Sequence, residues 1–221
     1  MIPDKPEVDR FYIYGAKGFA VQVWLSLLAA KSGIASKMQG FIDTVDEESR
    51  TLCDFPIFHS ESVLYEKGGQ VACFLGFGAH QPRIKLFEKL RKENIVFPNV
   101  IHPSAVVMSP VKENFGIYIG AQAVVDPLCQ IGFGCLINHH VVVSHESSLG
   151  DYVQLCPHVS VTGRCRCDQG VFVGTNATLV PDRKIGANSV VGANSLVLRD
   201  IPDNTLVYGS PAAPPKSESS R

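Results

Sequence analysis

The chain lacks long hydrophobic runs and has no large excess of either charge. Its 221 residues include 20 basic and 21 acidic side chains, for a formal net charge of −1, so no nucleic acid or other polyanion is expected as a partner. The longest apolar stretch, residues 20–30, is too short to span a bilayer. Residues 1–10 are acidic and contain prolines, unlike a secretion signal. These absences predict a cytoplasmic protein that makes no contact with membranes.

Paired cysteine motifs are also absent. The seven cysteines are an odd number, and no two of them have the Cys-x-x-Cys spacing of zinc ribbons and redox sites. A disulfide framework and a structural zinc site are therefore not expected. The sequence predicts that the cysteines are small buried thiols.

Residues 1–98 alternate between predicted strands and helices. Strands are expected over residues 11–14, 38–43 and 71–75. Apolar residues at helical spacing follow the first strand over residues 19–31, and an amphipathic helix follows the third strand. This alternation predicts a small parallel sheet with its loops clustered at the carboxyl ends of the strands.

Each of these strands ends in residues suited to binding. The segment Gly15-Ala-Lys-Gly18 is not a full dinucleotide fingerprint, but between a strand and a helix it can bring backbone N–H groups to a phosphate. Asp43 can accept hydrogen bonds from a ribose or a base, or it can serve as an N-cap or solvated turn residue. The segment Gly76-Phe-Gly78 after the third strand is expected to close the same substrate pocket as these residues. The predicted substrate-binding residues are Gly15, Lys17, Gly18, Asp43, Gly76, Phe77 and Gly78.

From residue 101 onward the sequence has a period of six. Fifteen of the seventeen positions at this spacing from Ile101 to Val197 are Ile, Leu or Val, whereas only 56 of all 221 residues are, so chance predicts roughly four. The exceptions are Glu113 and Cys167. Six residues suit one short strand and one turn, so three hexads form a triangular coil with the aliphatic side chains stacked inside. A helical solenoid is not expected, because it needs a 3.6-residue rhythm.

The hexad register and the segment Ile201–Ala212 resemble the hexapeptide-repeat acyltransferases, which fold as left-handed parallel β-helices. Residues 12–18, 40–43 and 138–150 further resemble the PglD/NeuD group of sugar acetyltransferases. The resemblance implies an α/β plus β-solenoid fold of two domains. A Rossmann-like domain over residues 1–98 would hold a nucleotide-linked amino sugar, and a left-handed β-helix over residues 99–212 would bind acetyl-CoA between neighbouring subunits of a homotrimer. Residues 213–221 are expected to form a disordered tail.

Three of the seven histidines lie close together in the chain, at His139, His140 and His145. His139 and His145 are one hexad apart and belong to different faces of a coil. His140 and His158 are three hexads apart, so they are expected to lie one above the other on adjacent coils, as the best metal candidate in the chain. Proteins that resemble γ-class carbonic anhydrases bind zinc with three histidines between subunits. A zinc site of that kind would leave a sugar-binding domain unexplained, so the sequence predicts no metal.

Acetyl transfer to an amine requires a base, and an imidazole beside a carboxylate suits that role because its pKa lies near the working pH. His145-Glu146 matches the His-Glu/Asp pair of the sugar acetyltransferases. The resemblance implies that His145 is the general base, that Glu146 orients it, and that Asn138 lies near the reacting sugar. An exposed histidine beside a solvated glutamate is the alternative. Cys156 and Cys165 do not lie beside His145 in the register, so no acyl-enzyme is expected.

The same resemblance assigns an oxyanion-binding amide to Gly163, three hexads after His145 and so on the next coil, although a tight turn also favours glycine there. The chain departs from the family pattern at Gln154, where many members have a histidine, and at Ser144, where some have an acid. Arg164, Arg166, Arg183 and Lys184 either contact cofactor phosphates or form a solvated charged corner. The predicted acetyl-CoA-binding residues are Gln154, Gly163, Gly174, Thr175 and Ala193.

The resemblance therefore implies an N-acetyltransferase that acts on a nucleotide-linked amino sugar, of the 4-amino-4,6-dideoxy class, for surface glycan synthesis. O-acetylation of a sugar such as sialic acid by the same histidine, a zinc-dependent γ-carbonic-anhydrase-like hydratase and a non-catalytic trimeric scaffold stay open. The sequence does not predict which nucleotide or which sugar is bound. The residues that contact them belong to loops such as residues 45–58, whose shape does not follow from a repeat.

Overall fold

The computed structural model describes residues 8–45, 48 and 50–215. The chain divides into two compact units between Val100 and Ile101. Most of the predicted tail, residues 216–221, lies outside the described residues. Neither α1 (Gly18–Ala29) nor α2 (His80–Leu90), the two α-helices in the described part of the chain, has the length and apolar composition of a membrane span.

The first unit is a mostly parallel six-stranded sheet with the strand order β3-β4-β2-β1-β5-β6. Strands β1, β2, β4, β5 and β6 pair in parallel, and only β3 runs antiparallel, to β4. This arrangement confirms the predicted parallel sheet. The bounds are β1 Val8–Tyr14, β2 Met38–Ile42, β3 Thr51–Leu52, β4 Phe55–Phe58, β5 Gln70–Leu75 and β6 Ile95–Val96, with 3-10 helices η1 Gly33–Lys37 and η2 Glu61–Leu64.

The sheet of the first unit forms around strands that are buried on both faces. Phe11 and Ile13 of β1 and Phe74 of β5 are fully buried, as expected for central strands of a parallel sheet. Helix α1 buries Val23 and Leu27, which lie about one turn apart on one side of the helix. The central strands therefore end together at one edge of the sheet, where Gly15, Asp43 and Gly76 follow β1, β2 and β5.

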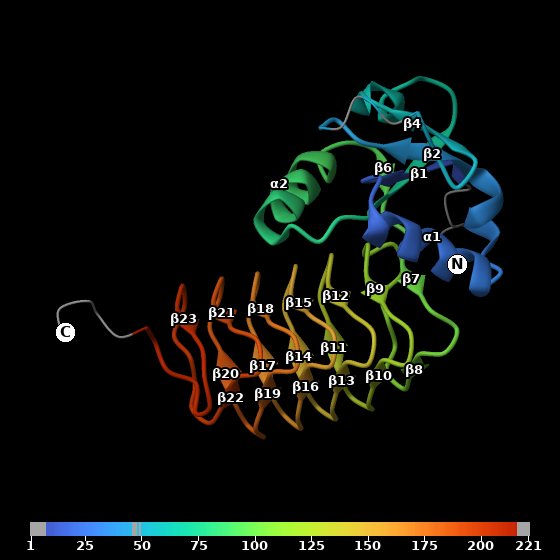
Figure 1. Ribbon diagram of the computed structural model, residues 1–221. Coiled ribbons are helices and arrows are strands. Elements are labelled where there is room, and N and C mark those ends of the chain that lie inside the picture. The colour runs from blue at the N-terminus through green and yellow to red at the C-terminus, as the bar shows by residue number, and fades with distance from the viewer. Residues whose placement is uncertain (1–7, 46–47, 49, 216–221) are drawn as a thin grey trace. The chain divides into compact units, whose positions relative to one another are not determined.

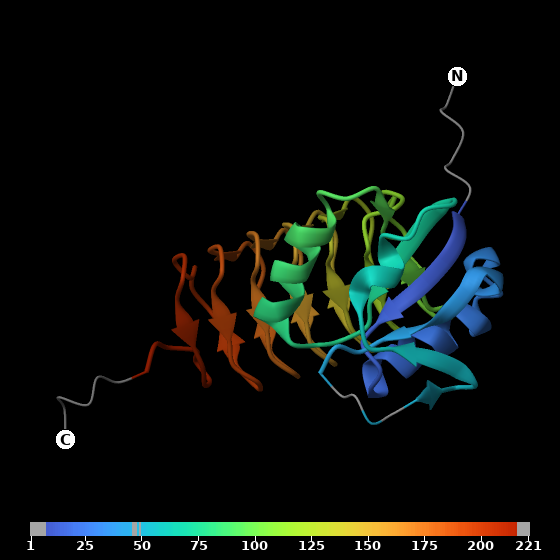
Figure 2. The same ribbon diagram turned by 90° about the horizontal axis from the view of Figure 1, so that it is seen from above.

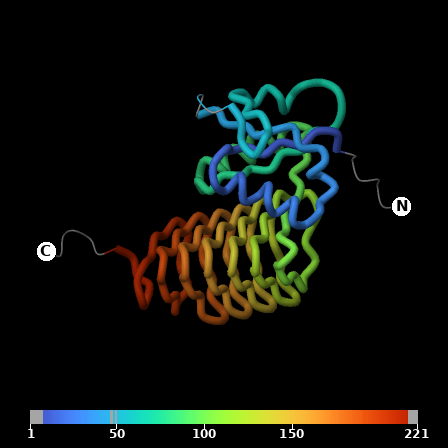
Figure 3. Tube along the Cα trace, turned by 45° about the vertical axis from the view of Figure 1, so that its right-hand side comes forward, coloured from blue at the N-terminus to red at the C-terminus, as the bar shows by residue number. Residues whose placement is uncertain are grey.

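The second unit is a left-handed parallel β-helix, as predicted. Its strands stack into three faces, and Figures 1 and 3 show the coils following one another in chain order. Strands that neighbour each other on a face are three hexads apart in the repeat, as in the pair Val124 and Val142 or the pair Leu136 and Gln154. Figure 2 shows the same row of coils from above. The six-residue period therefore folds as three strands per coil.

The three faces are named here by their strand order along the chain. The first face contains β7 Val100–Ile101, β9 Tyr118–Ile119, β12 Leu136–Ile137, β15 Gln154–Leu155, β18 Phe172–Val173, β21 Val190–Val191 and β23 Leu206–Val207. The second face contains β8 Val106–Val107, β10 Val124–Val125, β13 Val142–Val143, β16 Ser160–Val161, β19 Thr178–Leu179 and β22 Leu196–Val197. The third face contains β11 Gln130–Ile131, β14 Ser148–Leu149, β17 Arg166–Cys167 and β20 Lys184–Ile185.

Each strand has one inward and one outward residue. The second residue of each strand from β9 to β22 is buried in one continuous core. The two sequence exceptions have different explanations. No strand forms at Glu113, between β8 and β9, although the repeat continues in phase at Ile119. Cys167 is 1% exposed and fills an aliphatic position, and burial raises the pKa of its thiol.

Two corners of each coil contain most of the residues predicted to be functional on the β-helix. The first corner joins the first face to the second, as in residues 138–141, and the second corner joins the second face to the third, as in residues 144–147. Each corner contains one residue per coil in the left-handed backbone region, for example His140 (φ 57°) and Glu146 (φ 59°). Asparagine, aspartate and histidine are enriched in this region. Corner geometry alone therefore explains many of the polar residues there.

Candidate active site

The second corner after β13 presents His145 beside Glu146. The imidazole Nδ1 and the carboxylate Oε2 are 3.0 Å apart, and the two side chains are 51% and 50% exposed. A carboxylate only accepts hydrogen bonds, so Nδ1 carries the proton in this contact. The Nε2 atom of a neutral His145 then keeps its lone pair. The pair predicted from sequence is thus arranged so that Glu146 orients the imidazole and its Nε2 edge is left free of this contact.

Gly163 lies on the next coil, directly against the His145 ring. A Cβ atom at Gly163 would lie 2.7 Å from both Nε2 and Cε1 of His145. The Gly163 φ is outside the left-handed region, so the turn does not require glycine. At Gly174, by contrast, a Cβ would strike the backbone nitrogen of Ala193, so stacking of the coils requires that glycine. Gly163 is therefore needed for the imidazole rather than for the turn.

The Gly163 amide is available to a ligand. Among the described residues, none accepts a hydrogen bond from it, whereas the next amide, that of Arg164, donates to the His145 carbonyl at 2.9 Å. A base nitrogen and a backbone donor therefore lie together at the second corner. A site for acyl transfer requires both groups.

The remaining residues predicted on the β-helix lie elsewhere. Asn138 follows β12 at the first corner, and its Oδ1 accepts the His139 amide at 2.8 Å. Gly174, Thr175 and Ala193 also lie at the first corner, on later coils. Strand β13 separates Asn138 from His145 within a coil. A single copy of the chain therefore does not bring the residues of the two corners into one site.

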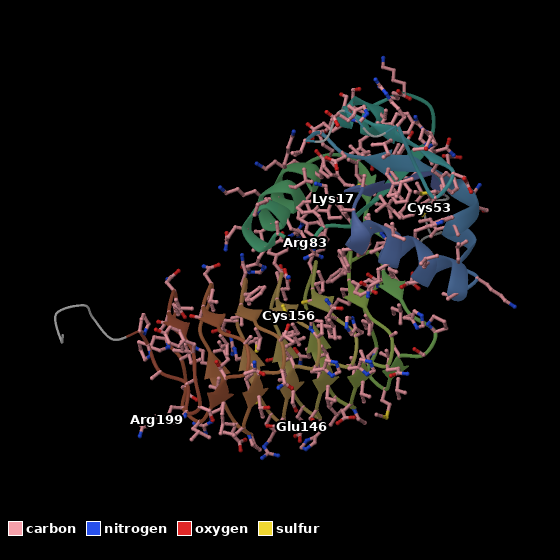
Figure 4. The ribbon with its side chains drawn as sticks, in the orientation of Figure 1. Lys17, Cys53, Arg83, Glu146, Cys156 and Arg199 are labelled. Atoms are coloured by element: carbon pink, nitrogen blue, oxygen red, sulfur yellow. The ribbon has the colours of Figure 1, made fainter. Side chains whose placement is uncertain are left out.

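Gln154 and Cys156 belong to the first face and the first corner. Gln154 is the outward residue of β15 and is 6% exposed. Figure 4 shows Glu146 at one outer edge of the solenoid, while Cys156 lies nearer the opposite edge. Burial raises the thiol pKa of Cys156 and of Cys165, and the Cys165 Sγ contacts the Val180 carbonyl at 3.2 Å. Neither thiol is placed to attack an acyl group at His145.

The other histidines of the cluster form a stack at the first corner. The rings of His140 and His158 are parallel to within 6°, with centroids 4.7 Å apart. The His139 ring is nearly perpendicular to both. Burial, followed by the charges of His140 and His158, lowers the pKa of His139.

This stack is poorly suited to a metal ion. Imidazole lone pairs lie in the ring plane, so the nitrogens of two parallel stacked rings do not converge on one point. Within residues 8–45, 48 and 50–215, no group of three histidine, cysteine or acidic side chains is arranged to hold a metal. His140 and His158 both occupy left-handed corner positions, with φ of 57° and 61°. Their position is explained by the backbone.

The four basic residues considered as phosphate contacts are each paired with an acid of the chain. Arg166 and Lys184 both contact Asp168, and Arg183 contacts Asp200. Arg164 is held by Asp182 through two hydrogen bonds of 2.7 and 3.0 Å. These contacts favour internal ion pairs over phosphate contacts, at the second corner for Arg164 and Arg183 and on the third face for Arg166 and Lys184.

The first unit has its own cavity at the carboxyl ends of the strands. Its volume is about 630 Å³. Six of the seven predicted substrate-binding residues line it, and Gly18, the first residue of α1, does not. Residues that the sequence reasoning missed include Tyr14, Thr44 and Leu86. Tyr14 could have been found, since it ends β1 on the same side as the glycine turn. The six lining residues are Gly15, Lys17, Asp43, Gly76, Phe77 and Gly78.

Two features shape this cavity. The Tyr14 and Phe77 rings lie 6.1 Å apart, and the Tyr14 hydroxyl is 3.4 Å from the Thr44 hydroxyl. Burial raises the pKa of Tyr14. Gly15 has a φ of 110°, and a Cβ there would lie 2.9 Å from the Gly76 carbonyl oxygen. The turn after β1 can therefore approach the backbone after β5 closely only because residue 15 is glycine, and a Cβ at Gly76 would strike the Ile13 side chain and Ala20.

The Asp43 side chain stabilises the turn that it belongs to. Its Oδ1 accepts the Val45 amide at 3.0 Å, and the residue is 8% exposed. This contact is typical of a turn stabilised by an aspartate. Because Asp43 also lines the cavity, the turn fixes its carboxylate at the cavity wall.

Known proteins and a solved structure are similar to this chain. No protein-family model matches the chain. It is 31% identical over 164 residues to serine acetyltransferase 4 of Arabidopsis thaliana. The aligned region makes up 70% of this chain but only 41% of that protein. The chain thus spans about two fifths of the length of this relative. It is 30% identical over 155 residues to galactoside O-acetyltransferase of Escherichia coli K12, covering 56% of this chain and 76% of that protein.

A solved structure is similar over nearly the whole length. It is a variant of the perosamine N-acetyltransferase of Caulobacter crescentus in complex with CoA and GDP-perosamine, with a TM-score of 0.72 and 25% identity. The match covers 96% of this chain and all of that one. Together with the six-residue repeat and the left-handed β-helix, these matches show that the chain belongs to the hexapeptide-repeat acyltransferases.

Proposed function

We propose that this protein transfers the acetyl group of acetyl-CoA to the amine of a nucleotide-linked amino sugar, in the cytoplasm and for surface glycan synthesis. The observation that carries the proposal is the His145–Glu146 pair packed against Gly163, whose amide has no acceptor among the described residues. The likeness to an N-acetyltransferase solved with CoA and GDP-perosamine supports the choice of substrates. We further propose that the sugar is of the 4-amino-4,6-dideoxy class.

The chemistry follows from three groups. The sugar amine attacks the thioester carbonyl carbon, and Nε2 of His145 takes the proton that the nitrogen loses. Glu146 orients the ring and stabilises its cationic form. The Gly163 amide donates a hydrogen bond to the oxyanion that develops on the carbonyl oxygen. The C–S bond then breaks, and the departing CoA thiolate receives the proton from His145.

The substrate would be held by the cavity of the first unit. The paired rings of Tyr14 and Phe77 offer an apolar surface for a base. Lys17 precedes the first turn of α1, where backbone N–H groups favour an anion such as a diphosphate. Asp43 offers a fixed carboxylate to a ribose or base donor. A nucleotide therefore has matching groups for each of its parts.

We propose that the active form is a homotrimer with sites between subunits. Asn138, Gly174, Thr175 and Ala193 lie at the first corner and His145 at the second, so a site that uses both corners needs two copies of the chain. The outward residues of the second face, which joins these corners, include three valines. The outward residues of the third face are polar. The outward residues of the second face are Val106, Val124, Val142, Ser160, Thr178 and Leu196, and those of the third face are Gln130, Ser148, Arg166 and Lys184.

O-acetylation of a sugar is the second candidate. The galactoside O-acetyltransferase of Escherichia coli favours it, since that relative is 30% identical over the aligned residues. His145 could remove a proton from a hydroxyl group by the same chemistry.

A thiol-release assay separates these candidates. The purified protein is given acetyl-CoA with UDP-, dTDP- and GDP-linked amino sugars, the matching sugars with a hydroxyl in place of the amine, and simple galactosides. We expect CoA release with at least one amino sugar and an amide in the product by mass spectrometry. Release with the hydroxyl compounds alone would establish O-acetylation, and release with none would contradict both candidates. Stoichiometric zinc in the purified protein would favour the hydratase.

A further inference from the structure

A column of alternating charges runs through the second corner, and it begins at the proposed catalytic pair. Glu146, Arg164 and Asp182 occupy the same corner position on three successive coils, with φ of 59°, 57° and 64°. The Arg164 amide donates to the His145 carbonyl at 2.9 Å, and the Asp182 amide donates to the Gly163 carbonyl at 3.1 Å. The three side chains therefore leave the backbone in the same direction, about 4.8 Å apart per coil.

The Arg164 guanidinium has one carboxylate on each side. It binds Asp182 with two hydrogen bonds, from Nε at 2.7 Å and from Nη2 at 3.0 Å. These bonds, followed by the Asp182 charge, raise the pKa of Arg164, and the Glu146 charge contributes in the same direction. The bond from Arg164 lowers the pKa of Asp182. Arg164 thus interacts with both acids, and it is hydrogen-bonded to Asp182.

The carboxylate that Arg164 binds determines whether the Glu146 carboxylate is available to His145. A guanidinium binds a carboxylate in the same two-pronged manner whichever acid supplies it. If Arg164 turned to Glu146, it would compete for the carboxylate that contacts Nδ1 of His145. We propose that Asp182 holds Arg164 away from Glu146 and so leaves the Glu146 carboxylate to position the His145 imidazole. Asp182 and Arg164 are positioning residues, and their effect on catalysis rests on the proposed role of His145.

The charges around the corner fix the sign of the expected effects. A general base must be neutral, so the rate rises with pH through the titration of His145. Without Asp182, a negative charge is lost and Arg164 approaches the pair, so protonated His145 is disfavoured. Without Arg164, a positive charge is lost and protonated His145 is favoured. The charged side chains at this corner in the described part of the chain are Asp126, Glu146, Arg164, Asp182, Arg183, Arg199 and Asp200.

The test compares Asp182→Asn, Arg164→Gln and the double variant. We expect Asp182→Asn to lower kcat about tenfold and to move the midpoint of the pH–rate profile down by about half a unit. Arg164→Gln should move the midpoint up by about half a unit. Both shifts are small because the charges at this corner are exposed to solvent and screened by salt. The double variant should recover most of the rate lost in Asp182→Asn, since no guanidinium remains to compete for Glu146.

The titration of His145, followed by NMR of its ring Cε1–H and assigned with His145→Ala, gives the same comparison without any substrate. If wild type shows no acetyl transfer, the proposed function fails while the NMR titration still tests the role of Asp182. The charge-matched control is Asp168→Asn, which breaks ion pairs with Arg166 and Lys184 away from this corner. A double variant as slow as Asp182→Asn, or an unchanged His145 midpoint in Asp182→Asn, would overturn the inference.

Discussion

At the scale of the residue, the contact between Gly163 and His145 makes a specific prediction. Gly163→Ala places a methyl group 2.7 Å from Nε2 of His145, so the ring must move and the amide is partly covered. Because the backbone there accepts alanine, we expect kcat to fall by about 10- to 100-fold with little change in melting temperature. Steady-state kinetics and thermal unfolding check this. The matched control is Gly174→Ala, which should instead lower the melting temperature, since its Cβ strikes the next coil.

An unchanged kcat in Gly163→Ala would show that the close approach of Gly163 to the imidazole is not needed for catalysis. Sequence reasoning identified His145 and Glu146 because the two are adjacent in the chain, and the structure shows their side chains in contact. It could not decide why Gly163 is a glycine, because the answer depends on a ring that lies one full coil earlier in the chain. It also treated His140 and His158 as a metal candidate, whereas their stacked rings sit at left-handed corners.

At the scale of the element, the prediction concerns the two residues of one strand. Leu179 of β19 is fully buried in the core, whereas its neighbour Thr178 points outward. Leu179→Ala should lower the free energy of unfolding by about 2–5 kcal/mol, and Thr178→Ala should change it by about 0.5 kcal/mol or less. Urea unfolding of both variants tests this. Equal effects at the two positions would contradict the assigned register of the coil.

The period made the β-helix predictable, because each inward position is read directly from the sequence. Departures from the period were not predictable. The missing strand at Glu113 and the short last coil, where Val207 pairs with Val191 rather than with the residue three hexads earlier, depend on local turns with no repeat. The β3–β4 hairpin was also missed, although its turn at Cys53 and Asp54 has two left-handed residues, a geometry typical of tight hairpins.

At the scale of the whole molecule, the prediction concerns sites shared between copies. If His145 of one copy works with Asn138 of another, then His145→Ala and Asn138→Ala subunits, mixed by unfolding and refolding together, should form some intact sites. A random trimer of equal amounts gives about a quarter of the wild-type activity, above that of either variant alone. Thiol release from the mixture measures it. No recovery, with trimers confirmed by light scattering, would place both residues in sites of a single copy.

The two-part organisation was predictable because the pattern of the sequence changes near residue 100. The identity of the nucleotide was not. The cavity of the first unit is lined partly by the loop after β2, which contains Thr44 and Val45 but has no repeat. Residues 46, 47 and 49 of that loop lie outside the described residues.

The central claim is that His145 removes the proton from the acceptor amine. The most direct measurement compares wild type with His145→Ala in the thiol-release assay, using the nucleotide amino sugar that gives the fastest turnover. We predict a fall in kcat of about 10²- to 10⁴-fold in a variant that keeps its melting temperature. His102→Ala, which changes a histidine two coils away, serves as the control and should retain activity. An undiminished kcat in His145→Ala would contradict the account.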